Sequence, residues 1–195
     1  MKKPIRVGGH PWVHAATQPQ NDVMPILERI FADFQYAGLD GIEMMFPMLD
    51  RDDGFEQVKA LAAKYRMPVI GCSWSGAMWN RAEHAKIIEF AEKLITRLAA
   101  LGGRNLGTTM EAAPSRKTEA QLDAQAECLR RIIAIANDHG VLLNLHNHVH
   151  EVKDDLHDLG GTIARVPEVK LGPDLGWLAR AGVDPVGFLR TYRDR

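Results

Sequence analysis

Short runs of β-forming residues alternate with longer amphipathic runs over the whole length of the 195-residue chain. The strand-like runs lie at residues 5–8, 41–46, 68–74, 105–109, 141–146 and 169–173. Helical patterns follow them at residues 21–37, 54–65, 80–102, 118–140, 156–165 and 184–195. Strict alternation of this kind is typical of a parallel sheet covered by helices. The sequence therefore predicts an α/β domain built from six strand–helix units.

Capping residues mark the starts of three of these helices. Asn80 is a favourable N-cap, and Thr118 stands three residues before Gln121, which is the spacing of a capping box. Asp184 precedes Pro185, a pair that is common at the first turn of a helix. These signals support the predicted order of elements.

Two parallel architectures fit this order, an open doubly wound sheet and a closed barrel. The segment Gly8-Gly9-His10-Pro11 after the first strand lacks the G-x-G-x-x-G pattern, so dinucleotide binding has no support. Polar residues recur at the ends of the predicted strands, namely His10, Glu43, Ser73, Thr109, His146 and Asp174. Because a barrel gathers all such strand ends around one pocket, we expect a (β/α)₈ TIM barrel.

The length of the chain bears on this expectation. A TIM barrel typically has about 250 residues, whereas the pattern here contains six βα units in 195 residues. We therefore expect residues 1–195 to form one TIM-barrel domain truncated after six βα units, with the two C-terminal units missing. Such a fragment would have open sheet edges, so a non-catalytic barrel fragment is kept as an alternative.

Composition limits which binding partners and which cellular compartment are expected. The formal net charge is −1, from 24 basic and 25 acidic residues, which gives no electrostatic case for binding nucleic acid or an anionic membrane. No window approaches the roughly 20 apolar residues of a membrane span, and the N-terminus is too polar for a signal peptide. The two cysteines, Cys72 and Cys128, do not form a disulfide framework, so we expect a cytoplasmic protein.

The segment from Asn144 to Glu151 holds three histidines and a glutamate at the end of an apolar run. If the strand alternation continues, His146 and His148 share one face about 6–7 Å apart, and Asn147 lies on the opposite, apolar face. Asp174 ends the next strand-like run and can point to the same side. Metal or substrate binding is the favoured interpretation. The alternatives are hydrogen-bonded core histidines and an Asp174 that caps the turn after it.

Glu43 and several tryptophans complete the set of candidate site residues. A carboxylate inside an apolar strand is costly unless it is paired or bound to a metal, so Glu43 indicates a partner in the pocket, with a salt bridge to Lys or Arg as the alternative. Aromatic side chains suit the C–H faces of a sugar, and His groups bind its hydroxyls. The candidate substrate contacts are His10, Trp12, Trp74 and Trp177.

The segments His146–Glu151 and Leu171–Val186 resemble the sugar phosphate isomerase/epimerase family. This family belongs to the xylose isomerase-like TIM barrels, on the branch near inosose dehydratases and ketose 3-epimerases. Its members hold one divalent metal through a Glu on strand five, an Asp on strand six, a His on strand seven and a Glu on strand eight. Asp174 matches the strand-six ligand. His146 stands at the strand-five Glu, and Trp177 stands where dehydratase-like members often have His, so acid/base roles and substrate contacts differ here.

The resemblance implies chemistry at the carbon next to a carbonyl of a sugar or sugar-derived ketone, through an enediolate. It implies a divalent ion (Mn, Co, Mg or Zn) held by His146 and Asp174. It also implies catalytic roles for His148, which orients substrate or metal, and for Glu43 as a secondary polar contact. Isomerisation, epimerisation and dehydration by an inosose dehydratase-like lyase all remain open, as do a homo-oligomer and the activity of residues 1–195 alone. Cleavage of abasic DNA, as in endonuclease IV relatives, fits poorly with the net charge of −1.

Overall fold

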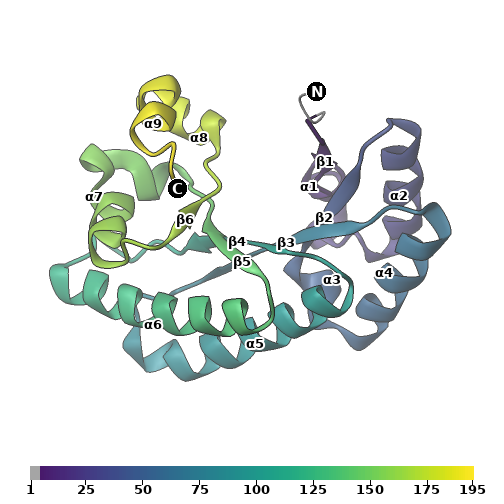
Figure 1. Ribbon diagram of the computed structural model, residues 1–195, viewed down its shortest axis with the longest axis horizontal. Coiled ribbons are helices and arrows are strands. Elements are labelled where there is room, and N and C mark those ends of the chain that lie inside the picture. Colours follow the sequence, from purple (N-terminus) through teal and green to yellow (C-terminus); the bar gives the residue numbers. More distant parts are fainter. Residues whose placement is uncertain (1–4) are drawn as a thin grey trace. The chain divides into compact units, whose positions relative to one another are not determined.

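The computed structural model describes residues 5–195, shown as a ribbon in Figure 1. Their contacts divide the chain into two compact units. The first unit contains the chain up to Ser73 together with Lys93–Asn105, and the second contains Trp74–Glu92 and Leu106–Arg195. The β3 strand, the α5 helix and the β4 strand each pass from one unit to the other.

The first unit is a small parallel sheet with helices after its strands. Its strands are β1 (Gly8–Gly9), β2 (Gly41–Met45) and the beginning of β3 (Val69–Gly76), hydrogen-bonded in that order. Its helices are α1 (Trp12–Ala15), η1 (Pro19–Asn21), η2 (Met24–Ile26), α2 (Leu27–Tyr36), α3 (Phe46–Asp50) and α4 (Asp52–Tyr65). Helices α2 and α4 pack side by side (Figure 1). The buried side chains Phe31 and Val58 lie on these two helices, so their apolar faces form part of the core.

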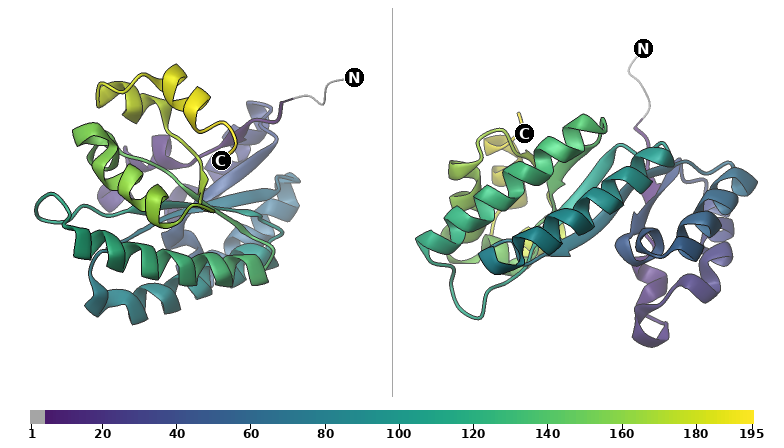
Figure 2. Two further views of the ribbon diagram at one scale, coloured as in Figure 1. Left: turned by 60° about the vertical axis from the view of Figure 1, so that its left-hand side comes forward. Right: turned by 90° about the horizontal axis from the view of Figure 1, so that it is seen from below.

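The second unit continues the parallel order from the end of β3. Its strands are β4 (Asn105–Met110), β5 (Leu142–Leu145) and β6 (Lys170–Leu171). Its helices are η3 (Arg81–Glu83), the first part of α5 (His84–Ala100), α6 (Glu119–Asp138), α7 (Val149–Arg165), α8 (Leu175–Arg180) and α9 (Pro185–Thr191). Helix α6 packs on α7, as both views in Figure 2 show. The apolar stripe of α6, with Leu122, Leu129 and Ile132, is buried.

The predicted fold class is confirmed. Within each unit the parallel strands follow one another in sequence order, without the reversal that a doubly wound sheet requires. The predicted capping box of Thr118 and Gln121 is present at the start of α6, and Asn80 and Asp184 cap η3 and α9. No helix among residues 5–195 combines the length and apolar character that crossing a membrane requires.

Several predicted boundaries were wrong. The first strand lies at Gly8–Gly9, and Ile5 and Val7 ahead of it are 91% and 55% exposed. Phe46 opens helix α3 rather than ending a strand, because Pro47 is tolerated in a first helical turn. Helix α7 starts at Val149 and is interrupted at residues 153–156. The sequence pattern predicted only the part of this helix after the interruption. The short helix α8 was not predicted.

Candidate active site

The loop between β5 and α7 carries the histidine motif. Strand β5 ends at Leu145, earlier than the sequence pattern predicts, and residues 146–148 leave the sheet in an extended conformation. The His146 N–H still donates to the Thr108 carbonyl at 2.9 Å, which holds the start of the loop against β4. The rings of His146 and His148 meet edge to face, with centroids 5.0 Å apart. The two side chains can therefore reach one common ligand.

His148 sits at the centre of a group of rings. Its imidazole is nearly parallel to that of His150, with centroids 6.0 Å apart, and lies 5.4 Å from the Trp177 ring. The Thr109 hydroxyl donates to the His146 carbonyl at 3.3 Å and lies 3.5 Å from His148 Nδ1. Because a hydroxyl has one proton, Thr109 then accepts from Nδ1–H. This arrangement leaves Nε2 as the unprotonated nitrogen of neutral His148.

Glu151 holds the histidine loop in place through its carboxylate. Its side chain is fully buried, and its two oxygens accept the N–H groups of Met110 at 2.9 Å and His148 at 2.7 Å. One of these oxygens lies 3.7 Å from ring nitrogens of both His148 and His150. The sequence marks Glu151 only as the end of the histidine-rich segment, with no predicted role. Glu151 stands at the N3 position of α7, three residues after the N-cap His148, where a capping box has Ser or Thr.

His146 is suited to bind as a neutral imidazole. Burial lowers the pKa of His146, and the neighbouring His148 lowers it further, while Asp174 and Glu151 act in the opposite direction. A lowered pKa keeps the ring unprotonated near neutral pH, which is the form that coordinates a metal ion. The metal role of His146 itself stays a prediction.

Asp174 is held in place by two sets of contacts. Its carboxylate caps α8, accepting the Trp177 N–H at 2.9 Å, so the capping alternative is what the structure shows. The Asn147 side-chain amide accepts the Asp174 N–H at 3.0 Å and donates to its carbonyl at 3.2 Å. Asn147 is 1% exposed. The sequence placed this residue on an apolar face and did not predict its two hydrogen bonds to the Asp174 backbone, which we call the Asn147 clamp. The clamp joins the histidine loop to the end of β6.

These side chains offer an incomplete set of metal ligands. His146 and Asp174 interact electrostatically, and an imidazole with a carboxylate is an appropriate donor pair for Mn, Co or Zn. Across residues 5–195, no group of three or more His, Cys, Asp or Glu side chains is arranged to hold a metal ion.

Glu43 lies in the first unit, in β2, opposite Gly71 of β3. A Cβ atom at position 71 would lie 2.8 Å from the Asn105 carbonyl oxygen, so the close approach of this backbone favours glycine, whereas Glu43 Cγ at 3.5 Å is at an ordinary contact distance. Burial raises the pKa of Glu43. No Lys or Arg within the described part of the chain forms an ion pair with it, which removes the salt-bridge alternative there. Its catalytic role stays a prediction.

His10 contacts Ser73 in the same unit. His10 Nδ1 accepts the Trp12 N–H at 3.2 Å, so in the neutral ring Nε2 carries the proton and donates to Ser73 Oγ at 2.9 Å. The Ser73 hydroxyl in turn donates to the Met44 carbonyl at 3.4 Å. His10 therefore does not act as a base toward Ser73 in this arrangement. A substrate contact by His10 remains a prediction.

The candidate tryptophans differ in how much of each side chain is exposed to solvent. Trp12, on α1, is 53% exposed, and Trp177 is partly exposed beside His148 with the Arg180 guanidinium 5.2 Å from its ring. Trp74 is only 4% exposed, and its indole N–H donates to Thr108 Oγ1 at 2.8 Å. The structure thus gives Trp74 a core position instead of the predicted place in a sugar-binding wall, because it lies within β3 rather than after it.

The family model described as "Xylose isomerase-like TIM barrel" matches residues 31–195. The chain belongs to this family. No curated protein sequence matches it. Among solved structures, it is similar to a sugar phosphate isomerase/epimerase from Parabacteroides distasonis, with 16% identity, a TM-score of 0.78, and coverage of 97% of this chain and 72% of that one.

Two further structures have different activities in their names. One is the 3-keto-D-glucoside 4-epimerase of E. coli, with 18% identity, a TM-score of 0.75, and coverage of 98% of this chain and 76% of that one. The other is the probable 3-DHS dehydratase of Bacillus anthracis, with 16% identity, a TM-score of 0.73, and coverage of 97% and 70%. At these identities the similarity shows the fold.

Proposed function

We propose that this protein is a metal-dependent sugar or sugar phosphate isomerase or epimerase that acts on the carbon next to a carbonyl. The observation that carries the proposal is the pair of adjacent imidazoles, His146 and His148, joined through the Asn147 clamp to Asp174. Membership of the xylose isomerase-like family supports it. Epimerases among the similar structures support the reaction class.

The residues divide into binding and proton-transfer roles. His146 and Asp174 would hold the divalent ion, which when bound polarises the carbonyl and lowers the cost of negative charge on its oxygen. His148, with Nε2 unprotonated, would remove the proton from the neighbouring carbon. Delivery of that proton to the adjacent carbon of the enediolate would give the isomer, whereas the epimer requires a second acid that delivers a proton to the opposite face of the same carbon. Glu151 holds the His148 backbone and keeps this ring in position. Trp177 would provide an apolar face beside the sugar.

Dehydration is the second candidate. A dehydratase appears among the similar folds, and the first step, loss of a proton next to a carbonyl, is the same. Expulsion of a β-hydroxyl group would then replace reprotonation. The outcome depends on which substrate carbon carries the leaving hydroxyl.

The test measures metal binding and proton exchange separately. Mn²⁺ binding is followed by isothermal titration for the wild type, His146→Gln and Asp174→Asn, the second of which retains a capping oxygen for α8. Both variants should bind Mn²⁺ at least about tenfold more weakly. Equal binding by the wild type and both variants would sink the metal assignment.

Proton exchange is followed by NMR in D₂O with Mn²⁺ and a panel of ketoses and ketose phosphates. His148→Gln should lower the rate of solvent deuterium incorporation about 10²- to 10⁴-fold, the usual contribution of a general base. New sugar signals would indicate isomerisation or epimerisation, and loss of a hydroxyl signal would indicate dehydration. A rate unaffected by His148→Gln would rule out this base.

A further inference from the structure

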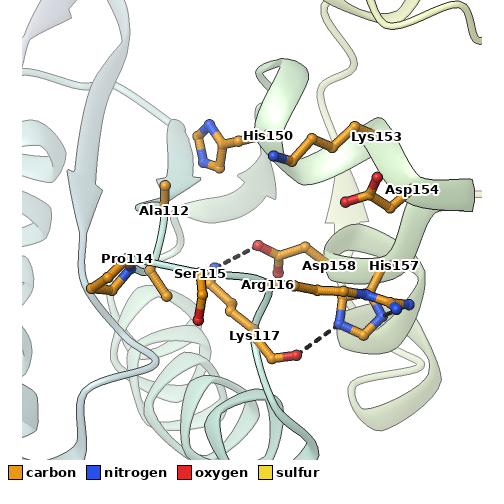
Figure 3. Close-up of a pocket in the computed structure, with 11 residues that line it drawn as sticks. Ala112, Pro114, Ser115, Arg116, Lys117, His150, Lys153, Asp154, His157 and Asp158 are labelled. Carbon is orange, nitrogen blue, oxygen red and sulfur yellow. Dashed lines mark hydrogen bonds and ion pairs between the residues drawn. The ribbon is translucent and has the colours of Figure 1, made fainter.

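A separate cavity of about 130 Å³ lies in the second unit, between the loop that follows β4 and the interrupted part of α7 (Figure 3). The loop contributes residues 112–117 and α7 contributes His150, Lys153, Asp154, His157 and Asp158. A cavity of this size has room for a phosphate or carboxylate group. We call it the Arg116 pocket.

The floor of the Arg116 pocket is a fixed polar network. Lys117 and Asp158 are both buried and form an ion pair at 2.5 Å, and Gln125 contacts each of them. The His157 ring accepts from Arg116 through Nδ1 at 2.9 Å and donates through Nε2 to the Lys117 carbonyl at 2.8 Å. The His157 ring therefore orients the Arg116 side chain, which lies beside it in Figure 3.

The wall carries an excess of positive charge. No carboxylate of residues 5–195 forms an ion pair with Arg116 or with Lys153, whose side chain runs along the rim toward His150 (Figure 3). Asp154 is the lining carboxylate outside the Lys117–Asp158 pair. Two unneutralised cations thus face one carboxylate, and a guanidinium with free N–H groups is a preferred partner of phosphate and carboxylate oxygens.

The backbone of α7 is distorted at the pocket. Asp154, Asp155 and Leu156 have φ values of 54°, 58° and 61°, in the left-handed region. Left-handed conformations cost roughly 1–2 kcal/mol per non-glycine residue. Such strain persists where the surroundings impose it, and it is frequent at ligand-binding segments. The break places Lys153 and Asp154 on the pocket rim instead of continuing the helix.

The Arg116 pocket adjoins the histidine loop through His150. This residue lines the pocket, donates to the Met110 carbonyl at 2.9 Å and stacks on His148. We propose that the Arg116 pocket binds the phosphate or carboxylate group of the substrate while the ketone end lies at His146 and His148. The substrate is then an anionic ketose derivative. Assigning the anion to the substrate rests on the proposed function, whereas anion binding itself does not.

The first experiment tests the pocket with inorganic phosphate alone, by isothermal titration without metal. Wild-type protein should bind phosphate saturably, and Arg116→Gln and Lys153→Gln should each bind about tenfold or more weakly. Both side chains are exposed, so the variants should fold normally, as circular dichroism would verify. Lys86→Gln removes the same charge from an exposed residue that does not line the pocket and should bind as the wild type does. No binding, or equal binding by all four proteins, would overturn the anion site.

The second experiment identifies the source of the anion by comparing fructose 6-phosphate, fructose and inorganic phosphate. Tighter binding of fructose 6-phosphate than of either other probe, weakened by Arg116→Gln, would support a substrate subsite. Equal affinity for fructose 6-phosphate and phosphate would keep the anion site and overturn its assignment to the substrate. His146→Gln should leave phosphate binding unchanged, so failure of the proposed catalytic site and failure of the pocket give different results.

Discussion

Strand β2 and the first turn of α7 each hold a glutamate that is at least half-buried, and the two glutamates meet opposite conditions. Glu43 in β2 has no ion-pair partner among residues 5–195, and burial raises its pKa. Glu151, after β5, is more deeply buried, yet both of its oxygens accept backbone N–H groups. Burying a carboxylate therefore costs free energy in β2, whereas at the start of α7 the carboxylate stabilises the fold. The reason is that only Glu151 accepts hydrogen bonds from backbone N–H groups.

The largest effect should come from removing the satisfied carboxylate. Glu151→Ala leaves the N–H groups of Met110 and His148 buried without an acceptor, which should lower the free energy of unfolding by about 2–5 kcal/mol. Urea denaturation at pH 7 measures this change. Glu168→Ala, at an exposed position, is the control and should change stability by less than about 0.5 kcal/mol. A similarly small loss for Glu151→Ala would remove the contrast between the two glutamates.

A smaller loss of stability is expected from changing Asn147, the second buried polar residue between β5 and the first turn of α7. Asn147→Ala removes both hydrogen bonds to the Asp174 backbone and should cost about 1–3 kcal/mol in unfolding free energy. If the alanine variant is as stable as the wild type, the clamp contributes nothing to holding the loop against β6.

The smallest change is expected at Glu43, and it has the opposite sign. A carboxyl whose pKa is raised in the folded state stabilises the fold below its unfolded pKa, and this contribution is lost as the pH rises through the folded pKa. Glu43→Gln should therefore increase the free energy of unfolding at pH 7 and leave it nearly unchanged at pH 4. Urea denaturation at both values tests this, with Glu168→Gln as the control. A loss of stability at pH 7 would show that the charged form of Glu43 has a partner.

The order of elements could be predicted from sequence, because helical and strand periodicities and caps such as Thr118 and Asp184 are local signals. The histidine motif stands out for the same reason, and its role as a site stays a prediction. The alternation of buried and half-buried side chains continues past the end of β5 at Leu145, with Asn147 buried and His146 and His148 half-buried, as the strand periodicity predicts. The periodicity could not predict the hydrogen bonds that Asn147 makes on its buried side, because their partner Asp174 lies 27 positions away.

The sequence by itself determined the parallel α/β fold, the family-typical motif pair and the presence of His146, His148 and Asp174 near strand ends. Only the tertiary structure decided which of these groups meet and what holds them. The contacts of Glu151 with Met110 and of Asn147 with Asp174 join residues 41 and 27 positions apart, beyond the reach of any local pattern. The same holds for the Arg116 pocket, whose loop and helix walls are joined by the Lys117–Asp158 and Arg116–His157 contacts, each across 41 positions.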